Sequence, residues 1–293
     1  MLIPPRFLLD AFVALVMASI GLRVTQGELF SILRNHRLLG RSLLANCVVV
    51  PVLGYLLART VPMDPQVRVG IMLLAAVPGT PVALQFTRTA RARLGFVAGL
   101  TFVLSIAAVA IAPVAVRVVP HIESQYRPGQ DLILSLLPQI VLPLAAGVML
   151  ARRWPSIAAK LAGPLSILAT VIFLFLMWET RAVRREAFRS MEGWPLLTML
   201  ALLVMAMAAG WWLGGPDRES RRVMATSTSM RNVVVCFFIA RYWFPGTKAY
   251  LVPIAYLGMM VPANLLFTLY QKWRERREGA LASADKTSRP QAA

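Results

Sequence analysis

Charged residues are scarce in this 293-residue chain, and acidic ones are the scarcest, with 13 aspartates and glutamates against 31 lysines and arginines. Cysteine and histidine are rarer still, at 2 each. Cys47 and Cys236 fall in apolar segments without CxxC spacing, and His36 and His121 lie in polar stretches between such segments. These shortages give no support to a disulfide framework, a zinc centre or a buried histidine relay. We therefore expect no metal site and no resident cofactor.

Apolar residues, in contrast, make up 58% of the chain, and the mean hydropathy is +0.65. Charged residues amount to 15%, against about 25% in soluble domains. The net charge of +18 comes almost entirely from arginines in short clusters between long apolar runs. This distribution is typical of loops beside a membrane and argues against a nucleic-acid partner. The composition predicts an integral membrane protein whose partner is the lipid bilayer, with no obligatory protein partner evident.

Nine stretches are long and apolar enough to cross a bilayer as helices, which takes about 20 residues each. They cover residues 5–22, 38–58, 67–88, 94–119, 132–150, 161–178, 194–213, 223–242 and 250–270. A cleaved signal peptide is the alternative for the first stretch, but it lacks an A-x-A site, Asp10 interrupts it, and further spans follow at once. The predicted fold class is an all-α integral membrane protein with nine transmembrane helices.

Lysines and arginines divide unequally between the two sets of loops, with 19 on the side of the carboxyl terminus and 11 on the other. The positive-inside rule then predicts a cytoplasmic carboxyl terminus and an outside amino terminus, in a plasma membrane of the bacterial inner-membrane type. The cluster from Arg181 to Arg189 runs against this bias. Residues 1–272 are predicted to form one transmembrane domain. Residues 273–293 have no apolar periodicity and are predicted to be a disordered cytoplasmic tail.

Two of the nine spans are interrupted near their middle, one in each half of the chain. Pro78-Gly79-Thr80-Pro81 breaks the third span, and the polar run from Thr226 to Asn232 breaks the eighth. Irregular backbone at membrane depth is tolerated only where protein or a water-filled cavity surrounds it. In secondary transporters, paired interrupted helices mark the substrate site near the bilayer midplane. An ordinary kink is the alternative for the first break.

Arg231 lies in the second break, about mid-segment, where a charge costs about 2.5–3.5 kcal/mol on insertion scales. Snorkelling to the membrane surface is the alternative, but either end of the span is about 13 Å away along the helix axis. No acidic residue lies deep in a span, since Asp10 and Glu179 lie toward ends. We therefore interpret Arg231 as a fixed positive charge without an obvious partner, which a carboxylate or sulfonate ligand could neutralise bidentately.

These interrupted segments resemble the two helix-crossing motifs of the bile acid:sodium symporter family. The resemblance rests on Val77-Pro78-Gly79-Thr80 through Thr87, on Ala90-Arg91, and on Ser229-Met230-Arg231-Asn232. Gly21-Leu22-Arg23 and Pro51 also fall in register, so the resemblance covers about residues 8–275. It implies a transporter domain of two inverted repeats, roughly 5–119 and 132–271, with two discontinuous crossing helices. The first helix of the family's ten-helix design would be missing here.

The resemblance implies a substrate site at the crossing of the two broken helices. The candidate substrate-binding residues are Arg231, Asn232, Thr80, Pro81, Gln85 and Thr87. It also implies ion-site positions, most of which have lost the family's ligands. These positions are Asn46, Ala83, Leu84, Val97, Thr101, Ser227, Thr228, Met230 and Arg231.

Sodium requires several oxygen ligands, preferably including an anionic one. Ala83 and Leu84 cannot ligate through their side chains, Ser227 stands where the family has a glutamate, and Arg231 where it has a glutamine. A guanidinium beside the site would repel a cation. Sodium is the one cofactor that the resemblance leaves open, and the replaced ligands argue against it. We expect Arg231 to take over part of the electrostatic role of the ion.

The function expected from these residues is that of a secondary transporter, which moves a small organic anion by alternating access. A non-transporting binding protein or receptor on the same fold is the main alternative, because drift would also remove ion ligands. A carrier of metalloid oxyanions is a second, less favoured alternative. An intramembrane enzyme is the least favoured, since HExxH, GxSxG and paired intramembrane aspartates are all absent. We expect no catalytic residues and no enzymatic activity.

Overall fold

The computed structural model describes residues 6–23, 35–79, 94–118, 141–191 and 193–288, and every regular element in these ranges is a helix. The helices of the first half are α1 (Arg6–Arg23), α3 (His36–Leu44), the π-helical turn η1 (Ala45–Val49), α4 (Val50–Thr60), α5 (Pro65–Ala76) and α7 (Leu94–Val118). Those of the second half are α9 (Leu142–Arg153), α10 (Pro155–Glu179), α11 (Arg181–Ser190), α12 (Trp194–Leu213), α13 (Arg218–Ser229), α14 (Val233–Trp243), the 3-10 turn η4 (Lys248–Tyr250) and α15 (Leu251–Ser288).

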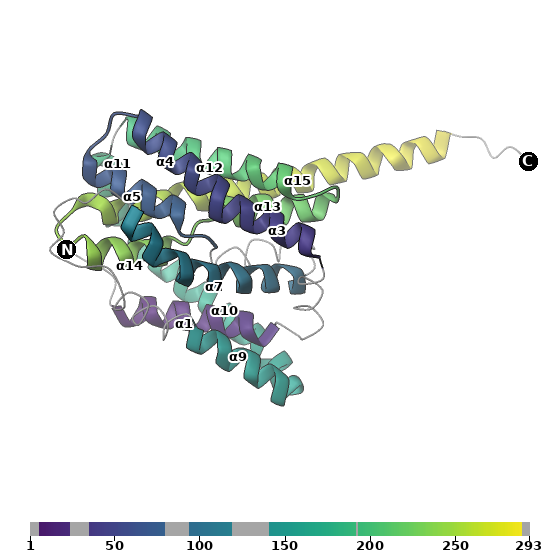
Figure 1. Ribbon diagram of the computed structural model, residues 1–293. Helices are drawn as coiled ribbons and strands as arrows, with labels where there is room; N and C mark the ends of the chain where they lie inside the picture. The colour runs from purple at the N-terminus through teal and green to yellow at the C-terminus, as the bar shows by residue number, and fades with distance from the viewer. Residues whose placement is uncertain (1–5, 24–34, 80–93, 119–140, 192, 289–293) are drawn as a thin grey trace, which may run out of the picture.

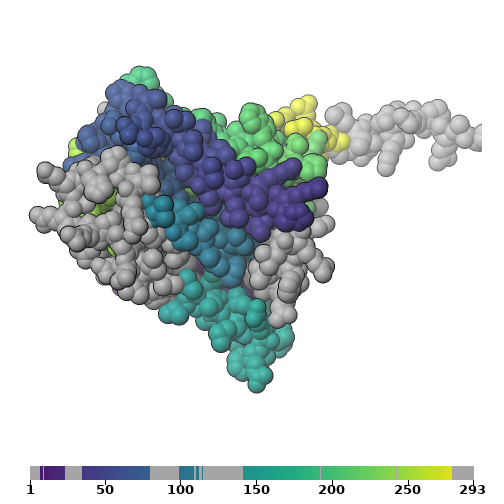
Figure 2. Space-filling model, in the orientation of Figure 1, coloured from purple at the N-terminus to yellow at the C-terminus, as the bar shows by residue number. Residues whose placement is uncertain are grey.

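The helices form two packed groups (Figure 1). In one group α1 runs along both α9 and α10, and in the other α12 packs along α13 while α4 packs along α5. Helix α7 contacts α1 on one side and α5 on the other, so it bridges the two groups. Figure 2 shows α3 and α4 across the upper part of one face, with the chain around α9 projecting at its lower edge.

Small residues let α1 and α9 approach closely. A Cβ added to Gly21 would lie 2.3 Å from the carbonyl oxygen of Leu144, and one added to Gly147 would lie 2.5 Å from that of Ala18. Close backbone approach at paired glycines is a common mode of helix packing in membranes, where lipid supplies no hydrophobic driving force. At these glycines α1 and α9 therefore meet in direct backbone contact.

Five helices in the described ranges are long and apolar enough to cross a membrane. They are His36–Thr60, Pro155–Glu179, Trp194–Leu213, Arg218–Arg241 and Lys248–Glu278. Large apolar side chains such as Leu174, Val204 and Leu266 are exposed along them, as expected for a surface in contact with lipid. The all-helical membrane architecture thus follows the prediction, while the count of nine spans stays a prediction.

The predicted spans coincide with the helices to different extents. Helix α12 has the predicted bounds, Trp194–Leu213. Helix α11 was not predicted, because its sequence carries four arginines and reads as a polar loop. It is an amphipathic helix that lies against α15.

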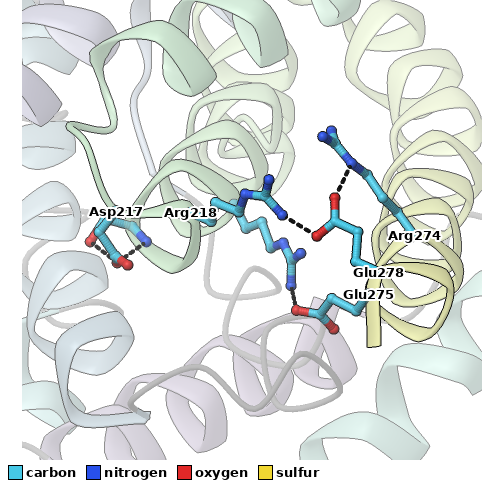
Figure 3. Close-up of polar contacts among 7 residues, drawn as sticks. Asp217, Arg218, Arg274, Glu275 and Glu278 are labelled. Atoms are coloured by element: carbon cyan, nitrogen blue, oxygen red, sulfur yellow. Dashed lines mark hydrogen bonds and ion pairs between the residues drawn. The ribbon is translucent and has the colours of Figure 1, made fainter. Parts of the chain in front are cut away.

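Residues 273–288 were predicted to be disordered, and this was wrong, because α15 continues to Ser288. Figure 3 shows how charged side chains support the extension: Glu275 pairs with Arg222, and Glu278 pairs with both Arg218 and Arg274. Ion pairs three and four residues apart on a helix and across two helices stabilise a segment without apolar periodicity. At the same end of the bundle, Asp217 caps α13 by accepting from the backbone N–H of Ser220 at 2.9 Å.

Candidate functional site

The first predicted break lies where α5 ends, and Pro78 explains it. Helix α5 is buried along most of its length and stops at Ala76; Val77 is extended, with φ −86° and ψ 105°. Gly79 has a φ of 68°, a conformation that favours glycine. Because proline lacks an N–H, Pro78 cannot donate to the carbonyl oxygen of Leu74, four residues earlier. The end of α5 therefore carries a free carbonyl inside the bundle.

A second free carbonyl arises in the π-helical turn Ala45–Val49. The backbone N–H of Val50 donates to the carbonyl oxygen of Ala45, five residues back, instead of to Asn46. The next donor in this register would be residue 51, which is a proline and has no N–H. Pro51 thus leaves the carbonyl oxygen of Asn46 unpaired by the backbone. The span His36–Thr60 remains continuous through this turn.

The second predicted break separates α13 from α14. Helix α13 ends at Ser229, Met230 is extended with φ −82° and ψ 96°, and α14 begins at Val233. Asn232 caps α14, since its Oδ1 accepts from the backbone N–H of Val235 at 3.2 Å. The three residues between the helices are buried, so an irregular backbone lies inside the bundle.

Arg231 projects from this second break onto the first. Its Nε donates to the carbonyl oxygen of Leu74 at 3.3 Å, and its Nη2 donates to that of Ala75 at 2.5 Å. The other contacts reach Asn46: Nη1 lies 3.2 Å from Oδ1, and Nη2 lies 3.3 Å from the carbonyl oxygen. Both proline-freed carbonyls, those of Leu74 and Asn46, therefore receive their hydrogen bond from one guanidinium. We call this arrangement the Arg231 junction.

The Arg231 junction is a cation in a cage of neutral oxygens. Arg231 is 0% exposed and is the one charged side chain among the fully buried residues that the structure describes. Its partners include the last carbonyls of α5, where the helix dipole places partial negative charge. The sequence offers no obvious partner that would neutralise Arg231, and its partners in the structure are neutral oxygens, most of them backbone carbonyls that a sequence does not display. One N–H of Nη1 has no acceptor in the described ranges.

Several predicted ion-site residues gather around the junction. Asn46 donates from Nδ2 to Thr228 Oγ1 at 3.3 Å and to the carbonyl oxygen of Ser42 at 3.1 Å. Ser227 instead donates to its own helix, at the carbonyl oxygen of Met224. The structure thus brings Asn46, Thr228 and Arg231 into contact, and it leaves the Ser227 hydroxyl engaged within α13.

Two polar residues near the break were not predicted as part of a site. Tyr256 is fully buried, and its hydroxyl donates to the carbonyl oxygen of Ser229 at 2.7 Å. Ser229 donates from Oγ to Asn264 Oδ1 at 3.0 Å. Helix α15 therefore supports the end of α13 through side chains. A buried tyrosine on an apolar helix gives no signal in the sequence that separates it from a core residue.

The remaining predicted residues are placed only in part. Thr80, Pro81, Ala83, Leu84, Gln85 and Thr87 lie outside the described residues. Val97 and Thr101 belong to α7, and Thr101 is buried. Met230 and Asn232 are buried at the second break. The Nδ2 group of Asn232 has no hydrogen-bond acceptor among the described residues, and it lies one residue before α14 begins.

An apolar pocket begins beside this break and lies between the two packed groups. Its walls come from α1 and α10 on one side and from α14 and α15 on the other, and include Phe12, Phe173, Val233, Val234, Phe237 and Leu257. Apart from the hydroxyls of Thr180 and Tyr250, every lining side chain is apolar. Sequence reasoning missed this pocket, because apolar residues on membrane helices are common and do not distinguish a cavity from a core.

The described residues contain no group of three or more histidine, cysteine, aspartate or glutamate side chains that could hold a metal ion. Both cysteines are free, Cys47 half-buried in the π-helical turn and Cys236 buried in α14. The chemistry available at the Arg231 junction is therefore electrostatic attraction and hydrogen bonding.

An all-helical apolar bundle with a buried charged junction and a pocket between two packed groups fits the class of membrane transport proteins. The model of the sodium bile acid symporter family matches residues 11–186, so the chain belongs to this family.

Curated relatives are distant and are named as transporters. A probable sodium/metabolite cotransporter of the chloroplast from Oryza sativa subsp. japonica is 20% identical over 78% of this chain and 55% of its own length. A sodium-dependent organic anion transporter from Rattus norvegicus is 22% identical over 91% of this chain and 74% of its own length. An uncharacterized sodium-dependent transporter from Bacillus subtilis (strain 168) is 18% identical over 94% of this chain and 86% of its own length. The chain thus spans only about half the length of the rice relative.

Proposed function

We propose that this protein moves a small organic anion across a membrane by alternating access. The observation that carries the proposal is the Arg231 junction, a fully buried guanidinium that joins the two predicted breaks and pairs with no carboxylate in the described part of the chain. Its positive charge acts over a longer range in a low-dielectric interior than in water, which favours an anion nearby. Of the candidate substrate-binding residues, the described ones are Arg231 and Asn232, and we propose that both face the anion. The roles of Thr80, Pro81, Gln85 and Thr87 stay predictions.

The apolar pocket is the proposed place for the body of the substrate. It begins at Val233 and Val234, directly after Asn232, whose Nδ2 donates to no atom of the residues that the structure describes. Apolar walls with few polar groups are typical of sites that bind small molecules. The substrate we infer is therefore an anion with an apolar body rather than a small inorganic oxyanion. This inference disfavours a metalloid-oxyanion carrier.

Alternating access requires two units that move against each other around the site. The group of α1, α9 and α10 and the group of α4, α5 and α12–α15 are the candidates for these units, since the pocket lies between them. The finer architecture belongs to the same proposal: nine spans, inverted repeats over about 5–119 and 132–271 within a transporter domain of residues 1–272, and two discontinuous helices that cross. The proposed orientation keeps the amino terminus outside and the carboxyl terminus in the cytoplasm, in a bacterial-type inner membrane.

Sodium is not required in this proposal, although the relatives are named for sodium dependence. A sodium ion binds where several oxygens converge. Four contacts with oxygens of Leu74, Ala75 and Asn46 are already made by a guanidinium that cannot leave. We infer that Arg231 supplies permanently the charge that a bound ion would supply transiently.

Uptake into proteoliposomes tests the proposal. The purified full chain is reconstituted and offered a panel of radiolabelled organic anions, with sodium and with choline replacing it, and across a pH step. The proposal expects saturable uptake of at least one anion with an apolar body, unchanged when sodium is removed. Thermal stabilisation by such an anion without any flux would instead support the alternative, a non-transporting binding protein.

A further inference from the structure

Helix α11 carries the arginine cluster that runs against the charge bias of the other loops. The helix is amphipathic, with Arg181, Arg185 and Arg189 exposed and Ala187 fully buried. Its inward positions are Val183, Arg184, Ala187 and Phe188. One arginine of the cluster, Arg184, therefore lies on the apolar face of the helix, where burial of a charge is unfavourable.

Neutral atoms hold the Arg184 guanidinium in place. Nη1 donates to Thr180 Oγ1 at 3.1 Å and lies 3.9 Å from the sulfur of Met177, and Nη2 donates to the carbonyl oxygen of Met177 at 3.0 Å. A guanidinium has five N–H groups, and at least two of them have no acceptor among the described residues. Within the described ranges no carboxylate forms an ion pair with Arg184.

Both residues that fix Arg184 belong to the wall of the apolar pocket. Met177, Thr180 and Val183 line the pocket on the side of α10 and α11, and Leu257 lines it on the side of α15. The stem of Arg184 passes α15 at the neighbouring Gly258, where an added Cβ would lie 2.9 Å from Arg184 Cδ. The guanidinium is thus fixed against two residues of the pocket wall. Burial lowers the pKa of Arg184, but an arginine remains charged at neutral pH.

We propose that Arg184 binds the head of an organic monoanion whose apolar body fills this pocket. The inference rests on the proposed function, because it treats the pocket as a substrate site. The ligand class is a carboxylate or sulfonate with a hydrophobic body, whose oxygens accept from the N–H groups that Met177 and Thr180 leave available. Arg185 and Arg189 are exposed on the same helix and take no part in holding the ligand.

Binding to the purified full chain tests this proposal independently of flux. The probe is 4-phenylbutyrate, with its neutral amide as the matched ligand, and the readout is ligand-induced thermal stabilisation in a neutral detergent at 0.15 M salt. Arg184→Gln should weaken 4-phenylbutyrate binding about 10- to 100-fold, the usual effect of losing a charge-assisted hydrogen bond. Arg185→Gln removes the same charge from the exposed face and should change the affinity less than about twofold.

Three further measurements make the outcome decisive. The amide should bind wild type and Arg184→Gln equally, which a misfolded variant would not do. Arg184→Lys keeps the charge and should retain part of the affinity. Val234→Trp fills the pocket and should weaken both ligands.

The proposal is overturned if Arg184→Gln and Arg185→Gln weaken binding alike, or if the amide binds wild type as tightly as the carboxylate. An anionic phospholipid also carries an anionic head on an apolar body and could bind at Arg184. The assay is therefore repeated in nanodiscs of phosphatidylcholine with and without phosphatidylglycerol. Arg184-dependent stabilisation by phosphatidylglycerol alone would overturn the assignment to a solute. Intact Arg184-dependent binding without any transport would count against the proposed function only.

Discussion

The Nη2 group of Arg231 lies 2.5 Å from the carbonyl oxygen of Ala75, so a side chain from the second half of the chain closes a helix of the first half. The same guanidinium reaches Leu74 and Asn46. A single residue thus satisfies backbone groups on two helices, and its loss affects both structure and charge. The two effects can be separated by experiment.

Arg231→Ala should lower the stability of the purified protein. Four acceptor contacts lose their donor, and leaving buried acceptors unpaired costs about 1–3 kcal/mol each before relaxation. A fall in apparent melting temperature of roughly 5–10 °C is expected, together with loss of anion uptake. Fluorescence-monitored thermal unfolding measures the first effect, and proteoliposome uptake measures the second.

Free guanidinium at millimolar concentration should partly restore Arg231→Ala, because it fits the oxygen cage that the side chain vacates. The matched control is Arg241→Ala, which removes an exposed arginine and should show neither the loss nor the rescue. An Arg231→Ala protein as stable as wild type, with no response to guanidinium, would contradict the description of the junction as a structural cation site.

Asn46→Asp should reduce anion uptake at least about tenfold while the protein stays folded. The substitution adds a carboxylate about 3.2 Å from Arg231 Nη1 and neutralises the fixed charge without removing it. It also removes the donation from Asn46 to Thr228, so Thr228→Val serves as the control that loses this bond and adds no charge. Initial uptake rates should fall for Asn46→Asp and change little for Thr228→Val. Equal rates in the two variants would argue against an electrostatic role of Arg231.

Uptake by the wild type should be within about twofold in sodium and in choline, because the guanidinium already fills the oxygen cage. The combined variant Ala83→Ser, Leu84→Asn, Ser227→Glu and Arg231→Gln restores the family's ligands as the resemblance assigns them. We expect it to gain sodium-dependent uptake. Two results would refute the hypothesis that Arg231 replaces the sodium ion. One is loss of uptake by the wild type when sodium is withdrawn, and the other is unchanged ion dependence of the combined variant.

Gly258→Ala should weaken binding of 4-phenylbutyrate and leave its amide unaffected. The added methyl group would lie 2.9 Å from both Arg184 Cδ and Phe188 Cε2, so the arginine stem must shift away from the pocket wall. Gly163→Ala is the matched control, since an added Cβ on that helical glycine meets nothing within 4 Å. The control should be neutral or stabilising by up to about 1 kcal/mol. Isothermal titration of both ligands distinguishes a displaced arginine from a general loss of fold.

The helical membrane architecture and the end of α5 before Pro78 could be predicted from the sequence because each has a local cause. Span length follows from bilayer thickness, as for Trp194–Leu213, and the end of α5 follows from Pro78. Arg231 could be singled out because a charge within an apolar span is unfavourable. All three inferences depend only on neighbouring residues in the chain.

The partners of Arg231 could not be predicted, because they are backbone carbonyls about 156 and 185 positions away in the sequence. The π-helical register that frees the Asn46 carbonyl depends on tertiary packing, although Pro51 is a local hint in retrospect. The inward direction of Arg184 could not be predicted, because it depends on which face of α11 packs against α15. In the sequence, the cluster from Arg181 to Arg189 resembles a solvated loop. Helical order in residues 273–288 was missed because ion pairs to another helix replace apolar periodicity.

Pro51 and Pro78 each leave one backbone carbonyl without a backbone donor, and Arg231 donates to both carbonyls. The three residues therefore depend on one another. Restoring an N–H at either proline would give the backbone its own donor and leave the guanidinium with surplus hydrogens in a dry interior. Substitutions at these positions should therefore be strongly non-additive, and a graft of this core onto another scaffold would have to carry all three residues together.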